Sequence, residues 1–219
     1  MMCENPMLAM PSERDVPEVV VLADGDWPSG RVAASLLRQA RCVVCCDGAA
    51  RRYLAGGGMP YAIVGDCDSL DPAIAARHAG LVHRIAEQAT NDQTKAVRFC
   101  LERGMRRIVI LGATGRREDH TLGNVSLLAD YAAEGAEVRT VTDHGVFDPL
   151  AAGTTRIASR AGQQVSLFAF DPATRIGGEG LKYALPERLR LWWVGTLNEA
   201  VGESFTLRVS QPALLFRVF

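Results

Sequence analysis

Short apolar runs alternate with amphipathic stretches through the first two thirds of the chain. Each run is rich in β-branched residues and ends in Gly, Asp or Thr: VVVLADGD, CVVCCDG, YAIVGDCDS and RRIVILGATG. Such runs are typical of parallel strands that are buried on both faces and followed by polar loops. Helices are predicted between them, over residues 31–40, 48–55, 72–78, 91–103 and 120–133. Repeated strand and helix segments predict a layered, mostly parallel α/β sheet.

The pattern changes after about residue 148. From Thr154 onward, short alternating segments such as QQVSLFAF and ESFTLRVS are separated by Gly and Pro, and no amphipathic helix is evident. Phe205, Leu207 and Val209 alternate in the second segment, so we expect them to share one face of a strand. We therefore expect an α/β domain over residues 1–150 and a small antiparallel β domain over residues 151–219.

Composition narrows the class of partner. Of the 219 residues 48% are hydrophobic, and 24 Lys and Arg nearly balance 25 Asp and Glu. A chain without a basic field is not built to neutralise nucleic-acid phosphates or to hold an anionic membrane. No apolar run approaches the roughly 20 residues that cross a bilayer. We expect a small-molecule partner and neither nucleic acid nor membrane. The six cysteines fit unpaired, buried thiols in a reducing cytosol, so we expect a soluble, cytoplasmic protein.

Two acids follow the third apolar run directly. In GDCDS (residues 65–69), Asp66 and Asp68 occupy alternate positions after a strand and can face the same way. Two carboxylates at this spacing can share a divalent cation, and Mg²⁺ favours one or two carboxylates together with substrate phosphates. Turn formation is an equally good explanation, with Asp71 capping a helix that begins at Pro72.

A glycine-rich loop, GATGRREDH (residues 112–120), follows the fourth run. Its glycines let backbone amides approach phosphate oxygens, and the N-terminus of the next helix favours anions. Arg117 can clamp a phosphate, and Asp119 can hold a metal ion or orient a nucleophile. Taken alone, the segment is better explained as a Gly-rich turn with Asp119 as a helix N-cap.

Other polar and aromatic residues have a functional and an ordinary explanation. Asp92 and Lys95 open a predicted helix about one turn apart. Lys95 can meet a phosphate there, although a surface ion pair is the more ordinary interpretation. Asp47 ends the second run and can contact nucleotide or metal, or cap the next helix. Trp192 and Trp193 are adjacent in a presumed strand, which places one in the β core and leaves the other to line a pocket.

Taken in order, these segments resemble the thiamine pyrophosphokinase family. The family patterns have the form DGGAN, GDFDS, DxTD leading into KA, GATGGRxDH, and GLKY followed by SN. The corresponding segments here are DGAAR (47–51), GDCDS (65–69), ATNDQTKA (89–96), GATGRREDHTLGN (112–124), GEGLKY (178–183) and GTLNEAVGESF (195–205). The motifs are individually of moderate specificity. Their order and spacing, over nearly the whole chain after residue 18, are hard to obtain by chance.

The resemblance implies a nucleotide-binding α/β domain, a C-terminal β-sandwich that binds thiamine, and a homodimer with shared active sites. It implies transfer of the terminal diphosphate of ATP to the hydroxyethyl oxygen of thiamine, with Mg²⁺ as cofactor and AMP as product. By position, the family's metal ligands are Asp66, Asp68 and Asp92, and its catalytic residues are these three with Asp119 and Arg117. Its nucleotide and phosphate contacts are Asp47, Lys95, Thr114 and Arg117, and its thiamine-binding region is matched by Tyr183, Thr196 and Asn198.

The chain departs from the family patterns at Arg51, Ala89, Arg116 and Leu197, where relatives have Asn, the first acid of DxTD, Gly and Ser. Any metal role of that acid is lost or passes to Asp92 or Glu87. Two other functions therefore stay open. One is a magnesium-dependent phosphohydrolase that forms an aspartyl phosphate. The other is a non-catalytic relative that binds thiamine or nucleotide. A glycosyltransferase with a metal-binding DxD is a weaker third alternative.

Overall fold

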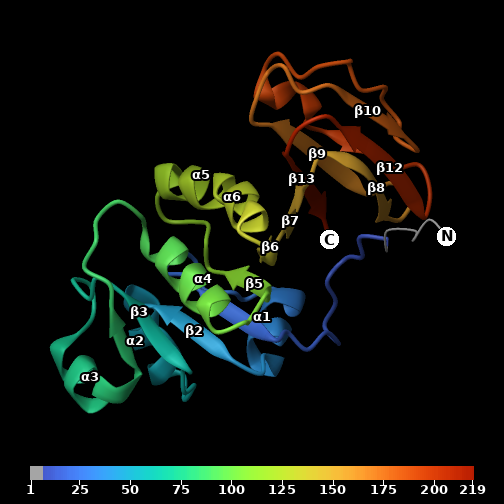
Figure 1. The fold of residues 1–219 in the computed structure, drawn as a ribbon. Coiled ribbons are helices and arrows are strands. Elements are labelled where there is room, and N and C mark those ends of the chain that lie inside the picture. Colours follow the sequence, from blue (N-terminus) through green and yellow to red (C-terminus); the bar gives the residue numbers. More distant parts are fainter. Residues whose placement is uncertain (1–6) are drawn as a thin grey trace. The chain divides into compact units, whose positions relative to one another are not determined.

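The apolar runs form a parallel sheet within Ser12–Asp143, one of two units into which the chain divides (Figure 1). The computed structural model describes residues 7–219. The strands of this unit are β1 (Val19–Leu22), β2 (Val43–Cys46), β3 (Ala62–Gly65), β4 (Val82–Arg84), β5 (Arg107–Leu111) and β6 (Glu137–Val141). They lie in the order β6-β5-β1-β2-β3-β4, and each neighbouring pair is parallel. The four predicted strands are confirmed. The short β4 and the half-polar β6 carry no continuous apolar run and were not predicted.

Helices cover this sheet. Every residue of β1, β2 and β3 is buried, as expected for strands covered on both faces. The helices are α1 (Arg31–Gln39), α2 (Asp47–Ala55), α3 (Pro72–Arg77), α4 (Asp92–Glu102), α5 (Glu118–Ser126) and α6 (Leu128–Ala133), with a 3₁₀ turn η1 (Ala79–Leu81). Helix α4 packs on β1, β2 and β3, and α6 packs on β6. The predicted helix over residues 120–133 is in fact two helices, which meet at Leu127.

Side-chain caps place the starts of two helices. Asn91 Oδ1 accepts a hydrogen bond from the Thr94 amide at 2.9 Å, which confirms Asn91 as the N-cap of α4. Asp71 Oδ1 accepts from the Ala73 amide at 2.7 Å, so the predicted cap before Pro72 is also confirmed. The alternative of Asp119 as an N-cap is wrong, because α5 begins one residue earlier and Asp119 lies inside its first turn.

The order of the strands reverses at β1. From β1 the chain proceeds through β2, β3 and β4 on one side, and it then returns to β5 on the other side. In an open α/β sheet, the crevice outside the carboxyl ends of the strands at such a reversal is the usual ligand site. Because the strands are parallel, the loops after β1, β2, β3 and β5 all begin at this edge.

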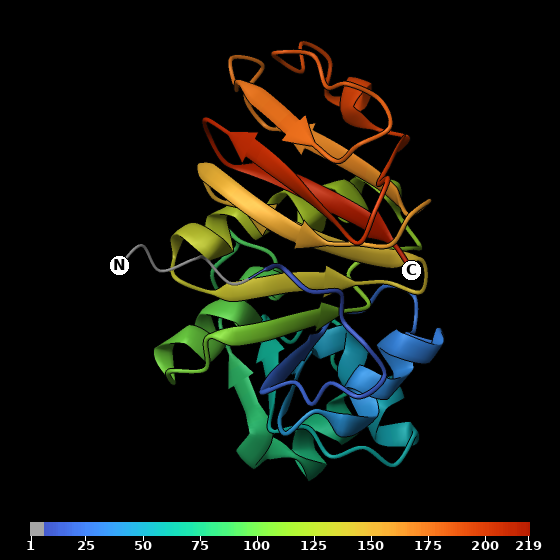
Figure 2. The ribbon, with the colours of Figure 1, turned by 90° about the vertical axis from the view of Figure 1, so that its right-hand side faces the viewer.

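The second unit, His144–Phe219 with the described residues up to Pro11, contains antiparallel strands of two sheets. Figure 2 shows its strands in yellow to red. In one sheet these strands have the order β11-β9-β13-β7, and the other sheet has the order β10-β12-β8. The strands are β7 (Gly145–Leu150), β8 (Gly153–Ala158), β9 (Gln164–Ala169), β10 (Ile176–Glu179), β11 (Asn198–Glu199), β12 (Ser204–Val209) and β13 (Ala213–Val218). Their apolar faces form one core, to which Phe205, Leu207 and Val209 contribute. The predicted β-sandwich and the shared face of β12 are thus confirmed.

The division between the units falls one strand before the expected domain boundary after residue 150. Strand β7 groups with the second unit because all six of its residues pair with β13. The cysteines described by the structure, Cys42, Cys45, Cys46, Cys67 and Cys100, are free thiols, as expected. Within residues 7–219 no helix combines the length and the apolar character needed to cross a bilayer.

The two adjacent tryptophans do not lie in a strand. They begin the 3₁₀ turn η2 (Trp192–Gly195), so the alternation of a strand does not apply to them. Trp192 is 55% exposed and Trp193 61% exposed. The expectation that one of them fills the β core is therefore wrong. The ring of Trp192 contacts the ring of Phe168, with 5.6 Å between centroids.

A buried ion pair ties the second unit together. Arg217 on β13 is fully buried and donates to Asp148 Oδ2 on β7 at 2.6 Å. The same guanidinium donates to the carbonyl oxygens of Leu8, Ala9 and Ala158 at 3.1, 3.1 and 3.0 Å. One side chain thus connects the segment before Ser12 to strands of both sheets.

We expect Arg217→Leu to lower the free energy of unfolding by about 3–5 kcal/mol, because Asp148 would stay buried without this cation. Arg208→Leu is the matched control. Arg208 pairs with Glu179 at 2.7 Å on the exposed surface, so its loss should cost at most about 1 kcal/mol. Denaturant-induced unfolding followed by circular dichroism measures both, and equal losses would contradict the importance of the buried pair.

Candidate active site

A cleft of about 610 Å³ opens at the carboxyl edge of the parallel sheet. Its walls come from the loops after β1, β2, β3 and β5 and from the first turn of α4. The expected site residues that line it are Asp47, Asp66, Asp92, Lys95, Arg117 and Asp119. Residues separated by up to 72 positions in the sequence therefore meet at one place, because parallel strands end at a common edge.

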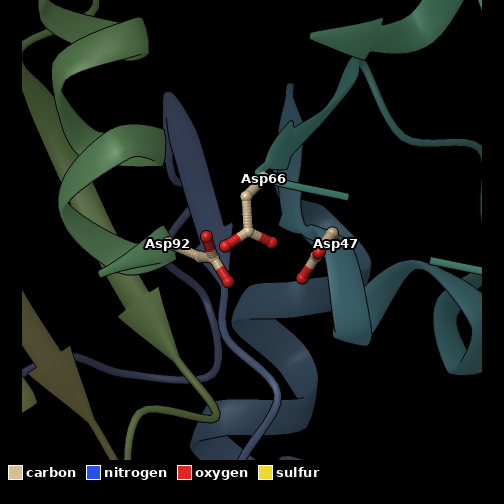
Figure 3. A group of neighbouring side chains, drawn as sticks. All are labelled: Asp47, Asp66 and Asp92. Atoms are coloured by element: carbon tan, nitrogen blue, oxygen red, sulfur yellow. The ribbon is translucent and has the colours of Figure 1, made fainter. Parts of the chain in front are cut away.

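Three carboxylates converge in this cleft (Figure 3). Asp47, Asp66 and Asp92 each offer an oxygen, and these oxygens all lie within 4.8 Å of one another. Asp47 is the first residue of α2, Asp66 follows β3 directly, and Asp92 is the first residue of α4. The resemblance implied a nucleotide contact for Asp47, and the residue by itself left a metal role open. Its position at the end of a strand was the available signal for a place among the acids, but only the pairing of β2 with β3 brings it beside Asp66.

Asp68 lies outside this group of three. The backbone turns at Cys67, whose φ is 67°, so the alternation that was expected to align Asp66 with Asp68 does not continue past β3. The Asp68 amide instead donates to Asp66 Oδ1 at 3.1 Å, and Asp68 itself is exposed. A metal role for Asp68 stays a prediction.

Lys95 places a cation beside two of the acids. Its Nζ lies 3.1 Å from Asp92 Oδ1 and 3.8 Å from Asp66 Oδ2. The side chain is only 2% exposed, so the interpretation of the pair as an ordinary surface ion pair is wrong. Burial by itself lowers the pKa of Lys95, but the hydrogen bond and charge of Asp92 outweigh it and raise that pKa above its usual value. The ammonium therefore stays charged.

The acids of the group differ in their electrostatics. Burial raises the pKa of Asp47, and the charge of Asp92 raises it further against hydrogen bonds from the Gly48 and Ser69 amides. The Asp68 amide and the Gln88 side chain instead lower the pKa of Asp66. An all-oxygen group of three carboxylates, one of which is costly to ionise, is suited to bind a hard divalent cation.

The loop after β5 also lines the cleft. Arg117 donates twice to Asp119, from Nη2 to Oδ2 at 2.5 Å and from Nε to Oδ1 at 3.1 Å. This bidentate pair lowers the pKa of Asp119 to about 2. Gly115 has a φ of 82°, and a Cβ on it would lie 2.1 Å from Asp26 Oδ2. Thr114 does not line the cleft, and its carbonyl oxygen accepts from the Asp26 amide at 2.8 Å.

The loop before α4 explains the departure at Ala89. The Glu87 carboxylate accepts hydrogen bonds from the amides of Ala89 and Thr90 at 2.7 and 3.1 Å. Glu87 therefore shapes this loop and does not join the group of three acids. Of the two residues considered as a replacement for the missing acid, Asp92 is the one that lies in the group.

Comparison with known proteins agrees with this geometry. Residues 33–140 match the family described as thiamin pyrophosphokinase, catalytic domain, and residues 145–216 match thiamin pyrophosphokinase, substrate-binding domain. The chain belongs to the thiamin pyrophosphokinase family. It is 26% identical over 202 residues to a thiamin pyrophosphokinase of Caenorhabditis elegans, covering 85% of this chain and 82% of that protein.

Solved structures show the same fold. The thiamin pyrophosphokinase of Geobacillus thermodenitrificans has a TM-score of 0.71 and 25% identity, over 92% of this chain and 97% of that one. The enzyme of Candida albicans has a TM-score of 0.78 and 18% identity, over 100% of this chain and 95% of that one. Membership in an enzyme family that acts with ATP disfavours the phosphohydrolase, the non-catalytic relative and the glycosyltransferase.

The residues expected to bind thiamine lie in the substrate-binding unit of this family member. Asn198 is buried, and its side chain bonds the backbone of Tyr183 twice, accepting at 3.1 Å and donating at 2.8 Å. The Thr196 hydroxyl donates to the Trp193 carbonyl oxygen at 2.7 Å. Both polar side chains therefore position backbone. The Tyr183 ring is exposed, and the Lys182 ammonium lies over it, 5.6 Å from its centroid.

We expect Asp47→Asn to raise the thermal midpoint near neutral pH when divalent cations are absent. An acid whose folded pKa lies above its unfolded value of 3.8 destabilises the fold increasingly as the pH rises from 3.8 to the folded pKa. Asn removes this destabilisation, so the gain in thermal midpoint should disappear well below pH 3.8, where Asp47 is protonated in both states. Scanning calorimetry in EDTA across this range measures the difference.

Asp119→Asn is the control, because Arg117 lowers the pKa of Asp119 to about 2. The stabilising effect of the ionised Asp119 carboxylate is present above pH 3.8 and is lost as the pH falls through about 2. The thermal midpoint of this variant should therefore be lower than that of the unmodified chain near neutral pH. A change of the same sign in both variants would refute the assigned electrostatics.

Proposed function

We propose that this chain transfers the terminal diphosphate of ATP to the hydroxyethyl oxygen of thiamine and releases AMP. Family membership supports the reaction, and the convergence of Asp47, Asp66 and Asp92 around the buried Lys95 is the structural observation that supports it best. Transfer of a phosphoryl-type group depends mainly on positioning and on neutralising charge. A cleft that joins a divalent-cation group to a glycine-rich loop with arginines fits this demand.

Mg²⁺ is the cofactor that we propose for the three carboxylates. The donors are all oxygens, and their mutual distances of up to 4.8 Å allow one ion to be shared. Bound there, Mg²⁺ would neutralise charge on the phosphate oxygens of ATP. Asp68, which follows on the same loop as Asp66, is proposed to act on this site from outside the group of three.

The remaining residues of the cleft have proposed roles that follow from their charge. Arg117 would stabilise the negative charge that grows on the transferred group. Asp119 would hold Arg117 in place, because a carboxylate with a pKa of about 2 is a weak base near neutral pH. Lys95 would act as a fixed point charge, and Asp92 would orient the thiamine hydroxyl for attack on the β-phosphorus. The role of Thr114 in nucleotide binding stays a prediction, since Thr114 does not line the cleft.

Analysis of the products tests this reaction. Incubation with ATP, Mg²⁺ and thiamine should yield AMP and thiamine diphosphate in equal amounts, and both should depend on thiamine. Formation of ADP and thiamine monophosphate would indicate single phosphoryl transfer. Release of inorganic phosphate or diphosphate without thiamine would indicate hydrolysis and would refute the proposal.

We expect Asp66→Asn to reduce turnover by on the order of a hundredfold or more, because Asn keeps the shape of Asp and removes a ligand charge. Asp68→Asn should reduce turnover less, since Asp68 lies outside the group of three. Initial rates of AMP formation, measured over a Mg²⁺ titration, compare the two variants. If Asp68→Asn were the more damaging change, the cation site would include Asp68, as the resemblance implied.

For thiamine, we propose the region of Tyr183, Thr196 and Asn198, with the aromatic ring as the contact. The thiazolium ring is a cation, and an exposed aromatic face attracts it. Tyr183→Leu should raise the KM for thiamine about threefold to tenfold and leave the KM for ATP unchanged. The control is Phe170→Leu, another exposed aromatic residue of the same unit. Equal effects of the two substitutions would remove Tyr183 from the site.

We also propose that the protein is a homodimer. Exposed apolar side chains, among them Trp192, Trp193 and Leu197, gather in the segment after β10, and a second copy would cover them. A monomer by light scattering at low micromolar concentration would contradict this. The described cysteines are free thiols, three of them buried, which supports the expected cytoplasmic location.

A further inference from the structure

Arg116 occupies a backbone position that favours glycine. Its φ is 58°, in the left-handed region, where a Cβ introduces strain. Gly112 and Gly115 in the same loop have φ values of 67° and 82°. The related family pattern has Gly at the position of Arg116, so this chain has exchanged the residue that suits the turn for a strained one.

The contact that Arg116 makes does not explain its presence. Its Nη1 donates to Asp24 Oδ2 at 2.7 Å, across the loops that follow β5 and β1. The two side chains are 51% and 42% exposed, and an exposed ion pair contributes less to stability than such backbone strain removes. Within residues 7–219 this is the only hydrogen bond of Arg116. The guanidinium has five N–H donors, so most of them are available.

The acidic residues of the cleft require an available cationic group if a polyphosphate is to bind there. Five acids line it, Asp24, Asp47, Asp66, Asp92 and Asp119, and a polyphosphate must enter among them. Lys95 is buried between two of these acids, and Arg117 is bound twice by Asp119. Arg116 also lines the cleft but is held by a single, half-exposed carboxylate. A phosphate oxygen can therefore join or replace that partner at little cost.

We propose that Arg116 is a second phosphate-binding arginine of the cleft, which contacts the polyphosphate of ATP and positions the nucleotide. This inference rests on the proposed function and extends it, because Arg117 alone matches the arginine of the family pattern. The planar fork of the guanidinium suits two phosphate oxygens, and a lysine would supply only a point charge.

Arg116→Gly and Arg116→Ala separate the side chain from the backbone. Both remove the guanidinium, so both should weaken ATP binding about tenfold, as loss of a charge-assisted contact does. Only Gly relieves the left-handed strain, so its thermal midpoint should exceed that of the Ala variant. Calorimetric titration with ATP and Mg²⁺ gives the affinity, and steady-state kinetics should show a raised KM for ATP and an unchanged KM for thiamine.

Arg107→Ala is the matched control. Arg107 lies at the other end of β5 and pairs with Glu18 at 3.3 Å, on the surface and outside the cleft. It should leave the affinity for ATP unchanged. If the Arg116→Gly variant bound ATP as tightly as the unmodified chain, Arg116 would be only a surface ion-pair residue. The inference would then be wrong, while the proposed reaction would stand.

The two proposals fail in different ways. If the unmodified chain bound ATP but formed no thiamine diphosphate, the proposed reaction would fail, and the titrations would still decide the role of Arg116. If the unmodified chain bound no ATP, both proposals would be overturned.

Discussion

The buried ammonium of Lys95 is the interaction on which the acidic cleft depends. Three carboxylates whose oxygens approach within 4.8 Å repel one another, and Asp47 is also partly desolvated. Lys95 compensates because its Nζ lies 3.1 Å from Asp92 and 3.8 Å from Asp66, with almost no access to water. Its position follows from the start of α4, which the Asn91 cap defines. Asp92 and Lys95 are three positions apart on α4, so they lie on the same side of the helix.

Fixed loops prepare the cleft for a charged ligand. The loop after β5 lies against the loop after β1 so closely that Gly25 leaves no room for a Cβ, which would come within 2.3 Å of the Thr114 carbonyl oxygen. The amides of Gly25 and Asp26 donate to carbonyl oxygens of the opposite loop at 2.7 and 2.8 Å. Polar groups carried on loops that are fixed in this way need little reorganisation when charge develops in a reaction, which is how electrostatic preorganisation lowers a barrier.

The departures from the family patterns alter the surroundings of the acids and leave the group of three complete. At Ala89 an acid is missing, and the neighbouring Gln88 donates to Asp66 Oδ2 at 3.1 Å, so a neutral side chain orients the carboxylate there. At Leu197 an apolar residue adopts a φ of 60° and is largely exposed, although its amide bonds Ser166 Oγ. The changes at Ala89 and Leu197 leave the fold intact because they lie in loops, where backbone geometry is the main constraint.

The sequence by itself determined the two kinds of architecture. Continuous apolar runs predicted β1, β2, β3 and β5, because strands buried on both faces admit few polar residues. Alternation predicted the inward face of β12, and motif order indicated the family. Strand alternation failed where the chain left a strand, at Cys67, and where it formed a 3₁₀ turn, at Trp192.

The resemblance grouped Asp66 and Asp92 as metal ligands, but only the tertiary structure decided that Asp47 joins them and that Asp68 does not. Asp66 and Asp68 are close in sequence, yet Asp66 groups with Asp47 and Asp92, which lie 19 residues before it and 26 after it. The reason is that the order of the strands, and not their spacing along the chain, determines which loops share the carboxyl edge of a parallel sheet. The local pattern of hydrophobic and polar residues does not specify that order. The burial of Lys95 and the ion pair between Arg217 and Asp148 likewise arise from contacts that form only when distant segments pack together.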